Sequence, residues 1–388
     1  MAPTVQKALI SPSKRAFWVL RNDWPVPKPQ PTEVRIKVMA SALNFADCFV
    51  QIFSIAFITK YPWVGGYDVA GVIDEIGSEV TDFAKGDRVV APAGSDRDSN
   101  RDSGFQEYCV CFAQNVAKIP DRMSFDAAAS IPLALTTAVA GMWSADRPEN
   151  PEFTTVAMTP PWEAGGTTKY AGKPAFILGG ATSVGQFAIQ AVRMHNFSPI
   201  IVTASLRHTD YLTSLGATHV IDRNLPAKAI LAEVRRITKG APVAYASDAV
   251  GDKTTQLLAF DSLAPDGRMS SVTPVGPWDR TKAKLAPGDT RRVGRAMASF
   301  RLPQYRELGV EVYKRLPGWL ETGALKPTRV QVLPGGLKAI PQGLRPIIGG
   351  KVSGVKLVVN PPDTPEDTKL EESWPNLKNY CAVIGRFM

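Results

Sequence analysis

The 388-residue chain has few of the residues that bind metals or crosslink a fold. It contains only four cysteines and three histidines, and the cysteines show neither zinc-site nor disulfide-framework spacing. A reducing compartment fits this usage. No apolar run approaches the ~18 residues of a membrane span, and the N-terminal residues have no apolar core of a signal peptide. We therefore expect a cytoplasmic protein without a membrane segment.

No stretch of the chain is dominated by charge of one sign. The net charge is +9, but the basic residues are scattered and form no block interleaved with aromatic residues. This distribution argues against a nucleic-acid partner and indicates a mild attraction for phosphate-bearing ligands. The hydrophobic content of 44% and the length of 388 residues are typical of a globular protein with two domains.

The strongest pattern in the chain lies in residues 174–193. Ala175–Leu178 is a short apolar run typical of a buried parallel strand, a turn of small residues follows at Gly179–Gly185, and a helix is predicted from Gln186 onward. Strand, turn and helix in this order begin a dinucleotide fold, in which the helix N-terminus binds the pyrophosphate. The match to Gly-x-Gly-x-x-Gly is imperfect, because Thr182 replaces the middle glycine.

The context of this turn favours dinucleotide binding over an ordinary strand-to-helix turn. A second strand is predicted at Pro199–Ser205, and a helix and a third strand are predicted within Tyr211–Asp222. These elements complete the required βαβ unit. The cofactor-binding residues predicted in the turn are Gly180, Ala181, Thr182, Ser183 and Val184.

The end of the second predicted strand indicates which dinucleotide is bound. An NAD site has Asp or Glu there, about 20 residues beyond the glycines. This chain has Thr203–Ser205 instead, with Arg207 just after it and Arg223 after the third strand. A hydroxyl and two cations would hold a 2′-phosphate, so we predict NADPH, bound by Ser205, Arg207 and Arg223. The alternative is that both arginines are solvated surface charges.

Further motifs lie on both sides of the predicted turn. In chain order they are Asn44–Asp47, Gly66–Gly77, Lys85–Val89, Gly104–Tyr108, Ile131–Thr137, Leu215–Ala217 and Gly350–Val358. Together they resemble the medium-chain dehydrogenase/reductase superfamily over about residues 1–360. The resemblance implies an α/β protein with a GroES-like β-barrel catalytic domain and a Rossmann dinucleotide-binding domain.

The same resemblance implies the domain boundaries. The GroES-like substrate domain would hold residues 1–137 and be completed by 301–360, and the Rossmann NADPH-binding domain would hold 138–300. Residues 361–388 fall outside the resemblance and form a C-terminal extension without an assigned role.

Zinc is not expected in this chain. Zinc-dependent members of the superfamily have a cysteine ligand where this chain has Asn44, and Gly-His-Glu where it has Gly66–Asp68. All three histidines lie in the Rossmann half. The chain therefore resembles the zinc-independent quinone and enoyl reductase branch, and we predict no metal site.

The segment between Met142 and Pro174 is rich in Pro, Gly and Thr, and we predict a long loop there. It is similar to a segment of fungal trans-acting enoyl reductases of polyketide synthases. This resemblance points to fungal secondary metabolism, with a small-molecule or carrier-bound enoyl substrate and a polyketide synthase as a candidate partner. The oligomeric state stays open between monomer and dimer, since both occur in the family.

The resemblance implies hydride transfer from NADPH to an activated carbon–carbon double bond, in an enoyl thioester or an enone. An NADPH:quinone oxidoreductase and a non-catalytic NADPH-binding protein are the alternatives. The predicted catalytic residues are Asn44, which takes a zinc-ligand position, and Tyr67, which could donate a proton or a hydrogen bond. For Tyr67 the alternative is core packing, and solvent is an alternative proton source.

The remaining predicted cofactor-binding residues come from two sources. Strand ends of the Rossmann sheet face the ligand, although apolar lining of the cleft is an equal alternative there. Other positions match those of the family. The residues are Thr137, Ala249, Val250, Val272, Thr273 and Lys356.

Overall fold

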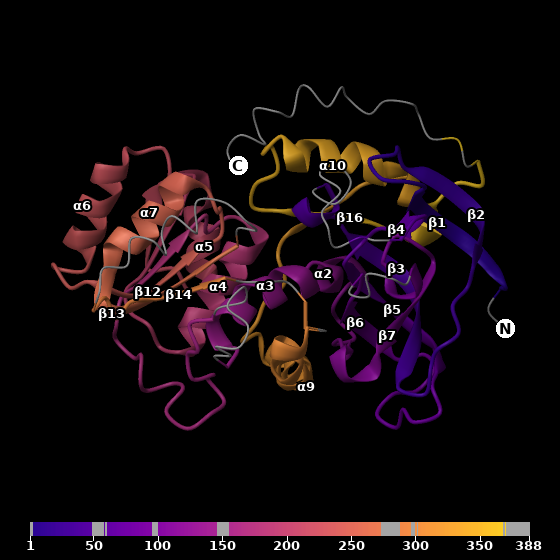
Figure 1. Cartoon of the computed structure of the whole chain (residues 1–388), viewed down its shortest axis with the longest axis horizontal. Helices are drawn as coiled ribbons and strands as arrows, with labels where there is room; N and C mark the ends of the chain where they lie inside the picture. Colours follow the sequence, from indigo (N-terminus) through magenta and orange to yellow (C-terminus); the bar gives the residue numbers. More distant parts are fainter. Residues whose placement is uncertain are drawn as a thin grey trace. The chain divides into compact units, whose positions relative to one another are not determined.

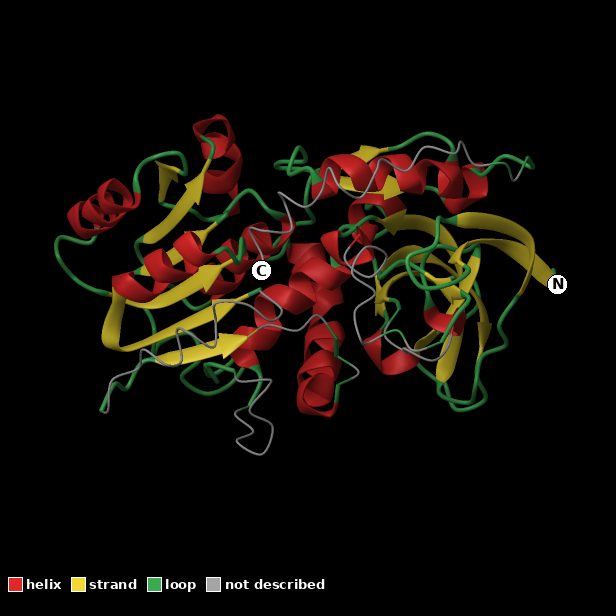
Figure 2. Ribbon diagram, turned by 45° about the horizontal axis from the view of Figure 1, so that its top comes forward, coloured by secondary structure: helices red, strands yellow, loops and turns green. Residues whose placement is uncertain are grey.

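The protein divides into two compact units. The structure, a computed structural model, describes residues 3–48, 58, 60–94, 100–145, 155–272, 288–295, 299–300, 302–367 and 369. Unit 1 holds the described residues of Met1–Leu133, Gly309–Gly323 and Pro327–Cys381, and unit 2 holds those of Ala134–Leu308 and Ala324–Lys326. Figures 1 and 2 show the elements of each unit.

Unit 1 is built mainly of strands. They are β1 (Val5–Ser11), β2 (Val19–Pro25), β3 (Glu33–Ala42), β4 (Trp63–Val64), β5 (Asp68–Ile76), β6 (Arg88–Pro92), β7 (Tyr108–Phe112), β8 (Ala117–Lys118), β15 (Val330–Val332) and β16 (Lys356–Val359). Its helical elements are α2 (Phe125–Ala129), α10 (Ile340–Ile348), most of α9 (Arg306–Thr322), and the short η1 (Asn100–Asp102), η2 (Ala113–Asn115), η6 (Gly336–Ala339) and η7 (Pro361–Asp363).

The main sheet of unit 1 has the strand order β15-β16-β3-β5-β6-β8, with β7 also paired to β3. A smaller sheet has the order β2-β1-β4. Alternating residues of β3 and β5, such as Val34, Ile36 and Val69, fill one core because successive strand residues point to opposite faces. The antiparallel pairing of β16 with β3 places Val358 opposite Ala42. Strand β16 thereby lies beside the end of β3.

Unit 2 alternates strands and helices. Its strands are β9 (Ala175–Leu178), β10 (Ile200–Ala204), β11 (His219–Asp222), β12 (Val243–Asp248), β13 (Leu263–Ser271) and β14 (Arg292–Arg295). Its helices are most of α3 (Pro132–Trp143), then α4 (Ser183–Met194), α5 (Thr209–Leu215), α6 (Ala227–Ile237) and α7 (Lys253–Ser262), with the short η4 (Leu206–His208) and η5 (Pro303–Tyr305).

The six strands of unit 2 form one parallel sheet in the order β11-β10-β9-β12-β13-β14. The order reverses between β9 and β12, which is the switch point of a doubly wound Rossmann sheet. Buried apolar residues of the strands and of α6 and α7, including Phe176, Ile201 and Val234, make its core. The strands and helices predicted between residues 175 and 222 lie where the sequence indicated, within a few residues at their ends.

The described part of the predicted loop, residues 155–172, contains neither helix nor strand, as expected. Buried aromatic contacts anchor it to the end of α4. The Trp143 indole donates to Nε2 of His195 at 2.7 Å, and Nδ1 of His195 lies 2.7 Å from the Gly166 carbonyl oxygen. The Tyr170 ring stacks on Phe197 with a centroid separation of 5.7 Å. His195 is therefore held as a neutral imidazole, and burial lowers its pKa.

One described stretch, Phe125–Trp143, is long and apolar enough to cross a membrane. However, 72% of it is buried inside the protein, and it is divided between α2 and α3. Core helices of globular proteins have the same composition, so this stretch is weak support for a membrane segment.

We expect the His195→Gln variant to lose part of the acid sensitivity of unit 2. The folded-state pKa of His195 lies below its ordinary value of 6.5, so the unfolded state binds more protons. Wild-type stability should therefore fall as the pH drops below that ordinary value, whereas glutamine cannot be protonated. Urea unfolding at pH 7.5 and pH 5.5, followed by tryptophan fluorescence, measures the difference.

The exposed His219 provides the control, because His219→Gln should unfold with wild-type pH dependence. Equal pH dependence of wild type and His195→Gln would contradict the assignment of a neutral, buried imidazole.

Candidate active site

The turn between β9 and α4 owes its shape to glycines. Gly179 has a φ of +74°, in the left-handed region that glycine favours. A Cβ atom on Gly185 would lie 2.3 Å from the Gly179 carbonyl oxygen, and one on Gly180 would lie 3.0 Å from Cβ of Val202. Because of these close approaches, α4 packs onto the turn and the turn packs onto β10 only without side chains at Gly180 and Gly185.

Thr182, which replaces the middle glycine of the motif, is the N-cap of α4. Its Oγ1 accepts a hydrogen bond from the Gly185 N–H at 3.0 Å. The N–H groups of Ser183 and Val184, in the first helical turn, have no intrahelical acceptor. The first turn of α4 contains no acidic residue. These N–H groups and the helix dipole suit a phosphate, so the residues present fit the pyrophosphate of a dinucleotide.

Three residues predicted to bind a 2′-phosphate lie at one edge of the parallel sheet. Ser205 follows β10, Arg207 lies in η4, and Arg223 follows β11. The Arg223 N–H donates to the Ala204 carbonyl oxygen at 3.0 Å, which joins the ends of β10 and β11. Both arginine side chains are exposed, and the Nε of Arg207 lies 3.2 Å from His208 Nε2. The structure thus places two cations at the edge where a ribose would lie in a dinucleotide fold.

The same edge contains a carboxylate that the sequence analysis overlooked. Asp222, the last residue of β11, lies opposite Ala204 in the strand register. One of its oxygens accepts a hydrogen bond from the Asn224 N–H at 3.0 Å. Its negative charge opposes the positive charges of Arg207 and Arg223 at this edge.

The other predicted cofactor residues of unit 2 follow β12 and β13. The Ala249 N–H donates to the Leu178 carbonyl oxygen at 3.0 Å, which ties the end of β12 to the end of β9. A Cβ atom on Gly179 would lie 2.6 Å from Cγ2 of Val250, so Val250 packs against the glycine turn. Val272 comes directly after β13. Thr137 is half-buried in α3, and Thr273 lies outside the described residues.

Unit 1 contains a buried polar network centred on Asn44, just after β3. The Asn44 amide donates from Nδ2 to Oδ2 of Asp68 at 2.8 Å and to the Ala42 carbonyl oxygen at 3.2 Å. Its Oδ1 accepts from the ammonium group of Lys356. Lys356 also pairs with Asp68, with an Nζ–Oδ2 distance of 3.1 Å. Asp68 is fully buried, and Lys356 and Asn44 are 5% and 6% exposed.

Two carboxylates extend this network to the backbone. The second oxygen of Asp68 accepts from the Leu133 N–H at 2.6 Å. Asp47 is fully buried and accepts from the N–H groups of Asn44 and Gly66, at 2.8 and 3.1 Å. The pKa of Asp47 is raised to about 7, mainly by burial; the nearby Asp68 also raises it, whereas the two N–H donors lower it. The network thus fixes the segment after β3 against the segment before β5.

The polar groups of Asn44 and Lys356, a predicted catalytic and a predicted cofactor-binding residue, bind protein partners inside unit 1. Both amide hydrogens of Asn44 are donated inside unit 1, and the Lys356 ammonium already has two acceptors there. The catalytic role of Asn44 and the cofactor-binding role of Lys356 therefore stay predictions. The sequence analysis missed Asp68 as their common partner. The available signal was an acidic residue at the start of the apolar run Val69–Ile73.

Tyr67, the other predicted catalytic residue, lies directly before β5 and is half-buried. Its carbonyl oxygen accepts from the Ala93 N–H at 2.8 Å. A Cβ atom on Gly94 would lie 2.8 Å from Cδ1 of the Tyr67 ring, so the ring packs against this glycine. A donor role of the hydroxyl stays a prediction.

In the part of the chain that the structure describes, no group of three or more His, Cys, Asp and Glu residues is placed to hold a metal ion. The segments around Asn44 and Asp68 instead present an amide, a carboxylate and an ammonium group to one another.

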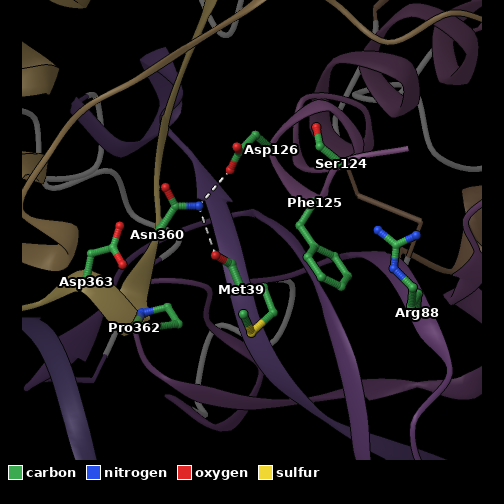
Figure 3. A pocket seen from close by; sticks show the side chains of 8 residues that line it. All are labelled: Met39, Arg88, Ser124, Phe125, Asp126, Asn360, Pro362 and Asp363. Carbon is green, nitrogen blue, oxygen red and sulfur yellow. Dashed lines mark hydrogen bonds between the residues drawn. The ribbon is translucent and has the colours of Figure 1, made fainter. Parts of the chain in front are cut away.

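A pocket of about 310 Å³ lies elsewhere in unit 1 (Figure 3). Its polar side chains already bind protein groups. The Asn360 amide donates to Asp126 at 2.6 Å and to the Met39 carbonyl oxygen at 3.1 Å. The Arg88 guanidinium donates to the carbonyl oxygens of Asp121 and Met123, at 2.6 Å each. We assign no functional site to this pocket.

Comparisons with known proteins match both units. Residues 30–121 match the family model of the alcohol dehydrogenase GroES-like domain, and residues 183–304 match that of zinc-binding dehydrogenases. The chain is 30% identical to the trans-enoyl reductase tndF of Aspergillus flavipes over 351 residues, which cover 86% of this chain and 93% of that protein. It is 28% identical to the trans-enoyl reductase grgB of a Penicillium species, over 92% of this chain and 98% of the relative.

Solved structures share the fold. The CurK enoyl reductase superposes with a TM-score of 0.71 at 23% identity, covering 92% of this chain and 98% of that one. The quinone oxidoreductase of Coxiella burnetii superposes with a TM-score of 0.66 at 23% identity, covering 91% and 98%. The predicted fold class, a GroES-like domain with a Rossmann domain, is confirmed.

We expect Lys356→Met to destabilise unit 1 by about 3–5 kcal/mol, because it leaves the buried Asp68 carboxylate without its counter-charge. The double variant Lys356→Met/Asp68→Asn should recover part of this loss. Urea unfolding measures both, with Lys37→Met, an exposed position on β3, as the matched control. A Lys356→Met variant as stable as the control would contradict a stabilising ion pair.

We expect Asp47→Asn to change how the stability of unit 1 depends on pH. The folded-state pKa of about 7 lies above the ordinary value of 3.8, so ionisation of Asp47 costs stability between these two values. The stability of Asp47→Asn relative to wild type should therefore rise from pH 4 to pH 7.5, by at most about 4 kcal/mol. Urea unfolding across this range tests the slope, and a relative stability that falls with pH would contradict it.

Proposed function

Because the chain belongs to the medium-chain dehydrogenase/reductase superfamily and is an oxidoreductase, we propose that it reduces an activated carbon–carbon double bond with NADPH, without zinc. The proposed acceptor is an enoyl thioester or an enone. The observation that carries this proposal is the match, along almost the whole chain, to relatives named trans-enoyl reductases, in a protein whose unit 2 contains a dinucleotide-type turn.

The choice of NADPH rests on the edge formed by β10 and β11. Ser205, Arg207 and Arg223 offer a hydroxyl and two guanidinium groups, which form charge-assisted hydrogen bonds with phosphate. Each such bond contributes about 1.5–3 kcal/mol. The carboxylate of Asp222 opposes them, but the two guanidinium groups still leave a net positive charge at this edge.

The proposed roles of the other residues follow from their positions. When bound, NADPH supplies the hydride, and the protein orients it. The turn Gly180–Val184 would bind the pyrophosphate, and the residues after β12 and β13 would face the nicotinamide half. Tyr67 is the proposed hydrogen-bond or proton donor toward the substrate oxygen or carbon. Asn44 and Lys356 would hold the segment beside Tyr67 through Asp68.

We further propose that the substrate reaches the enzyme as an enoyl group on a carrier of a polyketide synthase. The relatives named trans-enoyl reductases support this idea, together with the resemblance of the segment between Met142 and Pro174 to trans-acting enoyl reductases of polyketide synthases. A quinone is the second candidate acceptor, because the quinone oxidoreductase of Coxiella burnetii has the same fold.

The test follows the absorbance of the reduced nicotinamide with a crotonyl thioester, an enone and a quinone. We expect oxidation of NADPH by the thioester or enone, much slower oxidation of NADH, and no effect of a metal chelator. Turnover with the quinone alone would move the assignment to a quinone oxidoreductase. Tight binding of NADPH without turnover of any acceptor, carrier-bound ones included, would indicate a non-catalytic binder.

We expect the double variant Arg207→Ala/Arg223→Ala to raise KM for NADPH by roughly tenfold or more, since it removes two phosphate-binding cations. KM for NADH should stay near the wild-type value. Arg235→Ala, an exposed arginine on α6, is the matched control. An equal rise of KM for both cofactors would show that these arginines do not bind the 2′-phosphate.

A further inference from the structure

Asp248, at the end of β12, is a fully buried carboxylate to which neither the sequence pattern nor the proposed reaction gives a role. One of its oxygens accepts hydrogen bonds from the N–H groups of Val250 and Gly251, at 3.0 Å each. The other accepts from the hydroxyls of Thr255 at 3.1 Å and Ser271 at 3.4 Å. Both oxygens are therefore engaged by protein donors.

These contacts join three segments of unit 2. Val250 and Gly251 form the turn after β12, Thr255 lies in the first turn of α7, and Ser271 ends β13. Gly251 has a φ of +82°, which lets the chain fold back over the carboxylate. The backbone oxygen of Asp248 adds a fifth hydrogen bond, because it accepts from the Val272 N–H at 3.1 Å. One residue thus fixes both strand ends that carry predicted cofactor positions.

The ends of β12 and β13 lie where a dinucleotide binds in a sheet of this kind. Dinucleotides bind across the point where the strand order reverses, with one half on each side. In this sheet the adenosine half would lie over β9 and β10, and the nicotinamide half over β12 and β13. The turn held by Asp248 is at this point, since Val250 packs against Gly179 of the glycine turn.

A carboxylate is the side chain suited to this position. Its two oxygens offer about four acceptor sites and no donor, so it can accept from two N–H groups and two hydroxyls. Alanine offers no acceptor to any of these donors, whereas an asparagine could keep the two N–H bonds with its oxygen and donate its NH₂ group to the hydroxyls. Burial raises the pKa of Asp248 to about 6, while the N–H donors lower it and Asp252 raises it slightly. The charge is thus kept in the interior by hydrogen bonds to the turn.

We propose, on the basis of the proposed function, that Asp248 is a positioning residue for the nicotinamide half of the cofactor. It acts through the Val250–Gly251 turn, which it fixes against the glycine turn at the switch point. It touches no substrate in this assignment, and its effect is on where the nicotinamide lies.

The test compares Asp248→Ala with Asp252→Ala in the full-length protein. Asp252 is the N-cap of α7 and accepts from the Thr255 N–H at 2.8 Å, so this control removes a nearby carboxylate and a helix cap without changing the partner of Val250 and Gly251. The readouts are KM and kcat with NADPH, the Kd of NADPH, and the Kd of 2′,5′-ADP, which lacks the nicotinamide half.

We expect Asp248→Ala to weaken NADPH binding by roughly tenfold or more, because it removes every acceptor that holds the Val250–Gly251 turn. The Kd of 2′,5′-ADP should not change, because the adenosine half is bound elsewhere. Asp252→Ala should leave both affinities near wild type. Equal losses for NADPH and 2′,5′-ADP, or no loss for either, would overturn the assignment.

A second variant keeps the test decisive if Asp248→Ala fails to fold. Thr255→Val retains the carboxylate and removes one hydroxyl that donates to it, and it should cause a smaller loss of affinity that is again selective for NADPH. Unchanged NADPH affinity in Thr255→Val, or an equal loss for 2′,5′-ADP, would overturn the assignment. Failure of the wild-type protein to bind NADPH and 2′,5′-ADP would instead refute the proposed function itself, and this inference with it.

Discussion

The fold of unit 1 depends on a buried ion pair between Lys356 and Asp68. Removing two charges from water costs several kcal/mol for each ion unless hydrogen bonds compensate. Here the compensation is extensive, because Asn44 binds both partners and the Leu133 N–H binds the remaining oxygen of Asp68. The pair therefore fixes β16 beside β3 and β5 in one register, since a slip of one residue would turn Lys356 to the other face of the sheet. Correct placement of the segments around Asn44 and Tyr67 follows from it.

Each unit uses a buried carboxylate to hold an irregular backbone segment. In each, a fully buried carboxylate accepts two backbone N–H groups of segments that carry predicted site residues, Asp47 in unit 1 and Asp248 in unit 2. Burial raises the pKa of both, to about 7 and about 6. Such carboxylates add little to stability, because desolvation offsets much of the hydrogen bonding. Their effect is to hold an irregular segment in a single conformation.

Local patterns in the sequence predicted much of unit 2 and less of the site. The apolar runs of β9 and β10 and the small-residue turn between β9 and α4 are signals within about 20 residues, so strand, turn and helix could be read directly. The N-cap role of Thr182 explains why the turn works without its middle glycine. Asn44 and Lys356, by contrast, are 312 positions apart. Their contact depends on strand register, which no local pattern encodes, and Asp68, their common partner, was overlooked for the same reason.

The proposed cofactor site would then be held by two different kinds of interaction. Arg207 and Arg223 are exposed, so their attraction for a 2′-phosphate is screened by salt over a Debye length of about 8 Å at physiological ionic strength. The bonds of Asp248 are buried and are screened far less. Discrimination between NADPH and NADH should therefore weaken as salt rises, whereas the geometry of the nicotinamide half should not change. The adenosine end would select the cofactor by charge, and the buried carboxylate would set its orientation.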